Sequence, residues 1–315
     1  MFRSLARAVA VAGATALALT ACGGSTSPAP SAAPAGTVSV TDATGQVVDV
    51  PTSPTRVVVF DMSLLDSLDT LGVPVAGLPK QNVPEFLAEY RDARYADVGT
   101  LFEANLEAVN AADPDLILVA GRSAELKDDL TPIAPTLDLT TDSSRLMADY
   151  ERNARTLGTV FGKEAEVEKR LGELNTSITE TKGLAADAGR GLIVLTSGTE
   201  ATAYGPGSRF GIIHDVLGVP PAIPDVEAAT HGEAISFELI AQTNPDRMFV
   251  VDRDAATGNP ANAQQVLNNE LVTGTAAWRN GDVTYLDPTR WYIANAGLST
   301  LPASVEEIRA SLQAA

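Results

Sequence analysis

An internal repeat constrains the fold of this chain more than any other feature of its sequence. The segments NLEAVNAADPDLILVAGR (residues 105–122) and SFELIAQTNPDRMFVVDR (residues 236–253) align at an offset of 131 residues. Each copy predicts a helix, a Pro-Asp turn, an apolar strand and an arginine just past the strand end. We therefore predict two similar α/β lobes, although a chance resemblance between two ordinary helix–strand units would produce the same match.

Strand-like and helical patterns alternate along the rest of the chain. The run RVVVF (56–60) predicts a short buried strand, and MSLLDSLDTLG after it predicts a helix that Gly72 closes. This alternation is typical of mostly parallel sheets that are covered by helices. The predicted fold class is therefore α/β.

One long amphipathic helix separates the two halves of the pattern. Between residues 163 and 187, apolar side chains recur every three or four positions and charged side chains lie between them. We predict an N-terminal lobe at 37–162, this connecting helix, and a C-terminal lobe at 188–315. Ligands of open α/β sheets bind beyond the carboxyl ends of the strands, so Arg122 and Arg253 should lie on opposite walls of one cleft between the lobes.

The N-terminus predicts export and anchoring. Residues 1–21 contain two arginines, an apolar run and small residues, which is the pattern of a lipoprotein signal peptide. The only cysteine, Cys22, follows in LTAC, which looks like a bacterial lipobox, so it would become the lipidated first residue. A membrane-spanning helix is the alternative, but the apolar run is shorter than the ~20 residues that a span needs. Residues 22–36 predict a flexible tether, and we expect an extracytoplasmic protein, lipid-anchored to the bacterial cell membrane.

The charge balance limits the kinds of partner. The formal net charge is −18, and no basic run follows the N-terminus, which excludes a nucleic-acid partner because phosphates need a local excess of Lys and Arg. Any anionic ligand must therefore be held by a local cluster of cations. The single cysteine also excludes disulfides within the chain.

Four segments distributed over both lobes resemble one known family. They are RVVVFDMSLLDSLDTLGVPVAGLPK, YADVGTLFEANLEAVNAADPDLILVAGR, THGEAISFELIAQTNPDRMFVVDR and WYIANAGL. Over residues 37–313 the chain is similar to the iron-siderophore class of ABC-transporter substrate-binding lipoproteins, which have the class III periplasmic-binding-protein fold. Within that class it most resembles the catecholate binders of the enterobactin and petrobactin type. The resemblance implies two lobes joined by one rigid helix, a monomer without enzymatic activity or intrinsic cofactor, and a cleft that presents a ferric siderophore to a membrane permease.

The resemblance also implies the residues of the site. Three arginines would line the cleft, which are Arg122 in VAGRSA, Arg209 in GPGSRFG and Arg253 in VVDRDA. His231 in THGEA and Tyr292 in RWYIANAG would be direct ligands of the Fe(III) that the siderophore carries.

The chemistry of these five residues suits a ferric catecholate. A ferric ion held by two catecholates has two octahedral positions left, which a neutral imidazole and a phenolate can fill. Guanidinium groups stay charged, donate in a fork to catecholate oxygens and stack on aromatic rings. Three of them repel one another in the empty protein, so an anionic ligand is favoured over a neutral one.

Each member of the set also has an ordinary interpretation. A lone histidine such as His231 is more often solvated or in a core, and Tyr292 beside Trp291 is consistent with simple packing. We interpret His214 as structural, and Arg290 as a surface or helix-end charge close enough to Tyr292 to contact the ligand.

The repeat predicts a second site. Glu107 and Glu238 occupy matching positions on matching helices. In the family, one exposed glutamate per lobe contacts an arginine pocket on each subunit of the ABC permease dimer. Ordinary solvated glutamates are the alternative.

Three other functions fit the sequence less well. A secreted hydrolase lacks support because the chain has no GxSxG nucleophile elbow. A zinc-uptake protein usually needs several histidines, and this chain has two in unrelated contexts. Within the family, a ferric hydroxamate, haem or cobalamin is the main alternative ligand, but a neutral or cationic ferric hydroxamate gains little from three arginines.

Overall fold

The computed structural model describes residues 36–226, 232–260 and 262–314, and all of them belong to one compact unit, Ala35–Ala315. The predicted signal peptide, Cys22, almost all of the predicted tether and His231 lie outside the described residues. In the described part of the chain, the strands form one two-stranded hairpin and two five-stranded sheets. None of the helices described there combines the length and the apolar character of a membrane span.

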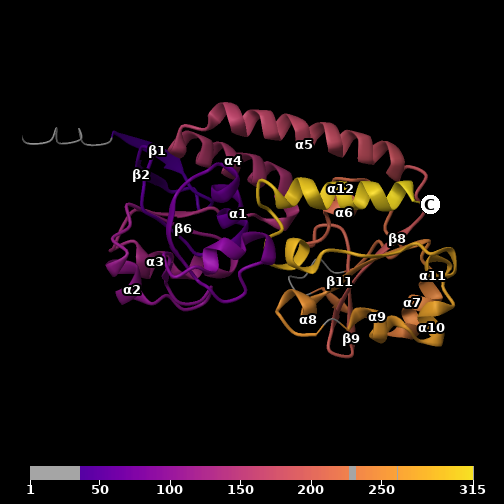
Figure 1. Cartoon of the computed structure of the whole chain (residues 1–315). Helices are drawn as coiled ribbons and strands as arrows, with labels where there is room; N and C mark the ends of the chain where they lie inside the picture. The colour runs from indigo at the N-terminus through magenta and orange to yellow at the C-terminus, as the bar shows by residue number, and fades with distance from the viewer. Residues whose placement is uncertain (1–35, 227–231, 261, 315) are drawn as a thin grey trace, which may run out of the picture. The chain divides into compact units, whose positions relative to one another are not determined.

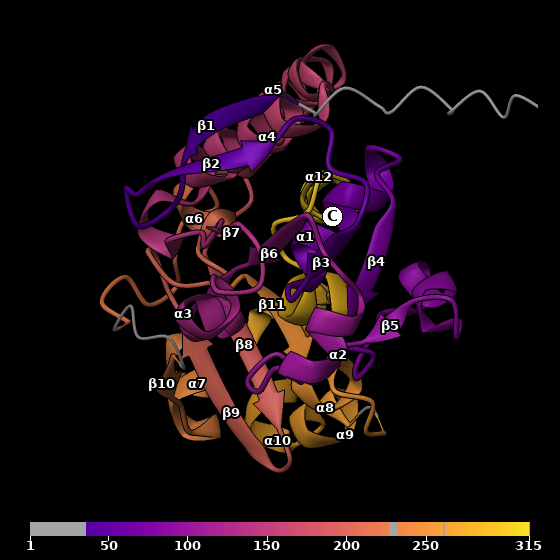
Figure 2. The same cartoon turned by 90° about the vertical axis from the view of Figure 1, so that its left-hand side faces the viewer.

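The first sheet and the hairpin come from the N-terminal half. The sheet has the strand order β5-β4-β3-β6-β7, and all of its neighbouring pairs are parallel. Strands β3 and β6 are fully buried, as expected for a parallel sheet covered on both faces. The antiparallel hairpin β1–β2 lies beside α4 (Figure 2). The bounds are β1 (Thr37–Thr41), β2 (Val47–Pro51), β3 (Val57–Val59), β4 (Val75–Leu78), β5 (Ala96–Asp97), β6 (Leu116–Val119) and β7 (Thr136–Asp138).

The second sheet comes from the C-terminal half and is mixed. Its order is β10-β9-β8-β11-β12, in which β8, β11 and β12 are parallel while β9 and β10 are antiparallel to their neighbours. The two-lobed α/β fold with mostly parallel sheets is thus confirmed. The bounds are β8 (Gly191–Ser197), β9 (Glu200–Tyr204), β10 (Glu233–Ala234), β11 (Arg247–Asp252) and β12 (Val283–Tyr285).

Helices connect and cover the strands. The α-helices are α1 (Met62–Thr70), α2 (Leu106–Ala111), α3 (Lys127–Leu130), α4 (Leu146–Phe161), α5 (Glu164–Ala185), α6 (Ile212–Asp215), α7 (Phe237–Thr243), α8 (Arg253–Ala256), α9 (Ala263–Leu267), α10 (Glu270–Thr273), α11 (Ala276–Asn280) and α12 (Thr300–Gln313). Short 3₁₀ segments are η1 (Glu85–Arg91), η2 (Gly121–Leu126) and η3 (Ser143–Arg145), and η4 (Thr289–Ile293) is a π-helical turn.

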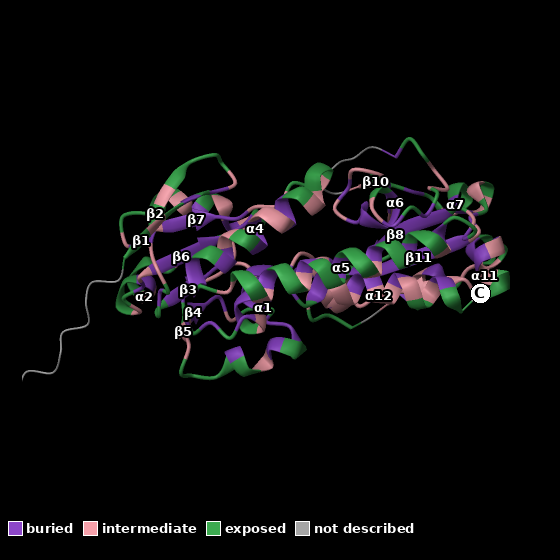
Figure 3. Cartoon of the chain, turned by 90° about the horizontal axis from the view of Figure 1, so that it is seen from above, coloured by how far each residue is buried: buried purple, intermediate pink, exposed green. Residues whose placement is uncertain are grey.

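The long helix α5 passes from one half of the molecule to the other, and α12 packs alongside it (Figure 1). It begins one residue after the predicted start, because Gly162 ends α4 in the left-handed conformation, with φ +63°. Its buried side chains recur at the predicted spacing, and its outer side is exposed (Figure 3). The buried positions are Val167, Leu171, Leu174, Ile178, Thr181 and Ala185.

The internal repeat is also a structural repeat. Each copy folds as a helix, a turn and a strand, and β6 and β11 hold the fourth place in their respective sheets. The matching residues Asp113 and Asn244 both have left-handed backbones, with φ +47° and +43°. The carboxylate of Asp115 accepts the N–H of Arg56 before β3 (3.0 Å), and Asp246 accepts that of Arg190 before β8 (2.7 Å). The repeated Asp therefore fixes the start of the adjacent parallel strand in each lobe.

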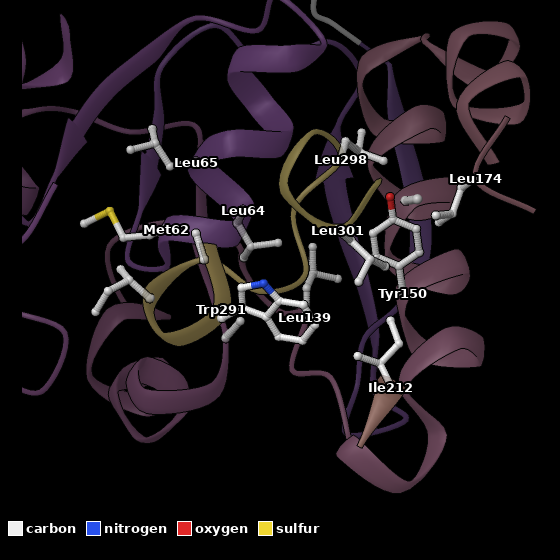
Figure 4. Packing of buried hydrophobic residues seen from close by; sticks show 14 of the residues in the cluster. Met62, Leu64, Leu65, Leu139, Tyr150, Leu174, Ile212, Trp291, Leu298 and Leu301 are labelled. Carbon is white, nitrogen blue, oxygen red and sulfur yellow. The ribbon is translucent and has the colours of Figure 1, made fainter. Parts of the chain in front are cut away.

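One apolar cluster extends through both halves. It contains Leu64 and Leu139 from the N-terminal half and Trp291 and Leu298 from the C-terminal half (Figure 4). A polar contact adds to it, because the buried carboxylate of Asp66 in α1 accepts hydrogen bonds from the first residues of α12. The two halves are thus tied together below the cleft.

Candidate functional site

A cavity of about 540 Å³ lies at the junction of the two halves. Its lining includes Arg122, Arg209, Arg253 and Tyr292, so the structure brings four of the five predicted ligand-binding residues together. The fifth, His231, is not among the described residues.

Each of these side chains is positioned by the end of a regular element. Arg122 lies in η2, directly after β6, and Arg253 is the first residue of α8, directly after β11. Arg209 lies in the turn that precedes α6, and Tyr292 lies in η4. The carboxyl ends of the parallel strands thus meet at the cavity, as expected for ligand sites of open α/β sheets.

Tyr292 is the common hydrogen-bond partner of the three arginines. Its carbonyl oxygen accepts from Nη2 of Arg122 (3.2 Å) and from Nη2 of Arg209 (2.8 Å). Its hydroxyl accepts from Nε of Arg253 (3.0 Å), whose Nη1 also donates to Oγ of Ser197 (2.9 Å). The bond from Arg122 joins the two halves of the molecule at the cavity.

The Tyr292 ring adds a second set of contacts with the same cations. The guanidinium carbons of Arg209, Arg122 and Arg253 lie 4.4, 5.4 and 6.0 Å from its centroid. Arg209 also lies 4.9 Å from the ring centroid of Phe210. The negative faces of these rings attract cations, so the arginine cluster is held in place before any ligand arrives.

The electrostatics of the cluster favour bound anions. Burial lowers the pKa of Arg209, and the neighbouring charge of Arg122 lowers it further. Burial alone would raise the phenol pKa of Tyr292, but the hydrogen bond from Arg253 and the charges of all three arginines outweigh it, so this pKa is lowered from its usual value. A negative charge placed among these groups is therefore stabilised.

One acidic side chain, Asp61, lines the same cavity. It caps α1 by accepting the backbone N–H groups of Ser63 (2.8 Å) and Leu64 (3.0 Å). Burial raises the pKa of its carboxyl group, although these hydrogen bonds and the charge of Arg122 act in the opposite direction. Sequence reasoning missed Asp61, although an Asp directly before an apolar helix is an N-cap signal.

The phenol of Tyr292 should ionise at lower pH than an ordinary tyrosine. We expect an ultraviolet absorbance titration to show a phenolate step below the ordinary tyrosine pKa, which is lost in Tyr292→Phe and moved to higher pH in Arg253→Gln. Tyr285→Phe is the control, because burial raises the pKa of Tyr285. Persistence of the low-pH step in Tyr292→Phe would show that another tyrosine carries it.

The predicted permease residues lie outside the cavity lining. Glu107 and Glu238 are exposed, and each is the second residue of its helix. Their N-caps also match, because the side chain of Asn105 accepts the N–H of Ala108 and that of Ser236 accepts the N–H of Leu239.

The two remaining sequence interpretations can be compared with the structure. His214 is buried and its Nδ1–H donates to the carbonyl of Val219 (2.7 Å), while burial lowers its pKa, so its structural interpretation is confirmed. The contact expected between Arg290 and the ligand gains no support from the cavity lining. Arg290 pairs with Asp287 (3.5 Å) and is not part of the cavity lining.

Gly232, the first described residue after position 226, lies against Ala203 and Tyr204. Gly232 has φ +68°, and a Cβ there would lie 2.6 Å from the Ala203 carbonyl oxygen and 2.9 Å from Cε2 of Tyr204. Burial raises the pKa of Tyr204, and the charges of Arg209 and Arg253 lower it, so this ring lies within electrostatic reach of the cluster. A side chain at position 232 is excluded by this close approach.

Two α/β lobes with a cation-lined cavity at their junction define a solute-binding protein. The chain belongs to the periplasmic binding protein family, whose model matches residues 57–289.

Individual relatives cover most of the chain. It is 40% identical over 267 residues to the petrobactin-binding protein YclQ of Bacillus subtilis and 34% identical over 271 residues to the ferric-anguibactin-binding protein FatB of Vibrio anguillarum, with 84% of each chain covered in both cases. Among solved structures, the catecholate-siderophore binding protein VctP of Vibrio cholerae matches with a TM-score of 0.82 and 30% identity, over 89% of this chain and 100% of that chain.

Proposed function

We propose that this protein is the extracytoplasmic component of an ABC importer that captures a ferric catecholate siderophore and delivers it to a membrane permease. The observation that carries the proposal is the convergence of Arg122, Arg209 and Arg253 on Tyr292 in one cavity. The names of three relatives, which specify petrobactin, ferric anguibactin and a catecholate siderophore, agree with it. The protein binds and releases its ligand without catalysing a reaction.

The geometry suits this ligand in two ways. Guanidinium N–H groups donate charge-assisted hydrogen bonds to catecholate oxygens. Their planes stack on catechol rings. Buried apolar side chains form the wall behind these polar groups, and these are Leu64, Leu139, Leu157, Ile293 and Leu298.

The polypeptide completes the coordination of the iron that the siderophore brings. The phenol of Tyr292 has a lowered pKa, so its proton leaves readily to solvent when the phenol oxygen coordinates the ferric ion. We propose His231 as the second protein ligand. This proposal is supported by the neighbouring residue Gly232, which packs closely against Ala203 and Tyr204 near the arginine cluster.

Selective binding tests the proposed function. We expect ferric bis-catecholate to quench tryptophan fluorescence with saturation, because Trp291 is adjacent to Tyr292, and we expect a ferric hydroxamate to have little effect. The second tryptophan, Trp278, lies outside the cavity lining, so Trp278→Phe should keep the response. Comparable binding of the hydroxamate would contradict the catecholate assignment.

We propose that Glu107 and Glu238 contact the two subunits of the permease. They are exposed at equivalent positions of the two lobes, so a permease of two similar subunits can engage both. The double replacement Glu107→Arg and Glu238→Arg should leave siderophore affinity unchanged and abolish ligand-stimulated ATP hydrolysis by the reconstituted transporter.

The matched control for this prediction is Glu164→Arg. Glu164 is also an exposed glutamate in the first turn of a helix, but it has no counterpart in the repeat. Normal ATP hydrolysis with the double variant would mean that the two glutamates are ordinary solvated side chains.

The predicted organisation completes the proposal. Signal peptidase removes residues 1–21, lipidated Cys22 anchors the monomer to the cell membrane, and residues 22–36 act as a tether. The lobes at 37–162 and 188–315 then close slightly on the ligand about the connecting segment 163–187.

A further inference from the structure

Phe102 is a strongly exposed aromatic side chain in the lining of the cavity. It is 72% exposed, whereas Phe86, the other exposed phenylalanine in the described chain, is 40% exposed. Phe102 lines the same cavity as Arg122 and Tyr292 and is absent from the apolar clusters of the described residues. Exposure of such a ring to water is unfavourable, so a ligand that covers it gains binding free energy.

The loop that carries Phe102 is well ordered by its own hydrogen bonds. Oγ1 of Thr100 accepts the N–H of Phe102 (3.2 Å) and of Glu103 (3.0 Å), and the N–H of Thr100 donates to the Glu103 carbonyl (2.8 Å). Gly99 closes the loop with φ +110°, where a Cβ would lie 2.5 Å from the Glu103 carbonyl oxygen. A bound ligand therefore meets a loop whose backbone is already ordered, so that the ring is the main part of the loop left to be fixed, which limits the entropic cost of binding.

The position of this ring complements the arginine cluster. Three arginines and Tyr292 supply charges, hydrogen-bond donors and guanidinium planes. Of the aromatic side chains in the described cavity lining, Tyr150 is buried and Tyr292 is half-buried, so Phe102 offers the most exposed ring face. It supplies this face on the N-terminal half of the cavity. We propose that Phe102 stacks on an aromatic ring of the bound ferric chelate and selects for aromatic siderophores. This inference rests on the proposed function, in which the ligand is a ferric catecholate.

Contact with the permease is the other role open to an exposed phenylalanine, because α2 with Glu107 begins four residues later. The cavity lining favours the ligand, since Phe102 belongs to it and Glu107 does not. The two roles separate in the isolated protein, where no permease is present.

The test compares Phe102→Tyr, Phe102→Leu and Phe102→Ala with the wild type in equilibrium dialysis against ferric bis-catecholate, read from the absorbance of the iron complex. We expect Tyr to retain wild-type affinity, Leu to weaken it severalfold, and Ala to weaken it by about tenfold or more, because alanine loses both the buried apolar area and the ring–ring contact. Phe86→Ala is the matched control, since Phe86 lies outside the cavity lining, and it should bind as the wild type does.

The outcomes separate a failure of the proposed function from a failure of the stacking role of Phe102. Failure of the wild type to bind ferric bis-catecholate would overturn the proposed function itself. If the wild type binds, equal affinity of Phe102→Ala would overturn the stacking role, and lost transport at unchanged affinity would assign Phe102 to the permease contact instead. Equal affinity of Phe102→Leu and wild type would show that the site needs apolar volume and not an aromatic ring. Matching thermal unfolding of all variants confirms that each is folded.

Discussion

Replacement of Arg209 by glutamine should weaken the binding of ferric bis-catecholate by about 100-fold, which is ~3 kcal/mol. Arg209 is partly buried, donates to the Tyr292 carbonyl, and lies over the rings of both Tyr292 and Phe210. Glutamine removes its charge, its forked donor geometry and its stacking surface together. Equilibrium dialysis or calorimetric titration of both proteins measures the difference.

Two further variants separate the causes of this loss. Arg209→Lys keeps the charge but loses the planar fork, so its affinity should lie between those of wild type and Arg209→Gln. Arg94→Gln is the matched control, because Arg94 makes the same kind of contact with Tyr95 at the surface, with a hydrogen bond of 2.8 Å and a distance of 4.7 Å to the ring. Wild-type affinity in Arg209→Gln would show that the arginine cluster does not hold the ligand.

Replacement of Asp66 by alanine should lower the free energy of unfolding by about 3–5 kcal/mol. Asp66 is 2% exposed, and its carboxylate accepts the N–H groups of Ser299 (2.8 Å) and Thr300 (3.2 Å) and the hydroxyl of Ser299. Alanine leaves the N–H of Thr300 buried without this partner, removes two hydrogen bonds from Ser299, and breaks a polar link between α1 and the start of α12. Urea unfolding followed by circular dichroism measures the change.

The control for this prediction is Asp49→Ala. Asp49 is exposed and accepts one hydrogen bond, from Oγ of Ser39, so its replacement should change stability by less than about 0.5 kcal/mol. A similarly small change in Asp66→Ala would contradict the view that this carboxylate ties the two halves together.

Local sequence patterns were sufficient to predict the main architecture. The repeat at 105–122 and 236–253 predicted two equivalent helix–strand units, and the apolar spacing after residue 163 predicted the long helix. Both signals depend on residues close together in the sequence, and the spacing of apolar residues in such short segments is the main predictor of helices and strands. The sheet topology explains why Arg122 and Arg253 meet. Each lies just after the carboxyl end of a strand, β6 or β11, that holds the same place in its sheet.

Other parts of the site depend on contacts between distant segments, which no local pattern records. Tyr292 bonds Arg122 across 170 positions of sequence and Arg209 across 83. Asp66 reaches Ser299 across 233 positions. Phe102 reads as an ordinary apolar loop residue, and its exposure at the cavity becomes visible only when the N-terminal sheet and its loops are assembled. Arg290 is two residues from Tyr292 in sequence but pairs with Asp287 and is not in the cavity lining, so closeness in sequence alone does not identify a lining residue.

The most direct measurement is the position of the iron in crystals grown with ferric bis-catecholate, located by anomalous scattering at the iron absorption edge. The proposed function predicts one strong peak in the cavity, within direct coordination distance of the Tyr292 hydroxyl oxygen and surrounded by Arg122, Arg209 and Arg253. A peak on another face of the molecule, or a loaded protein in which these four side chains make no contact with the chelate, would contradict it.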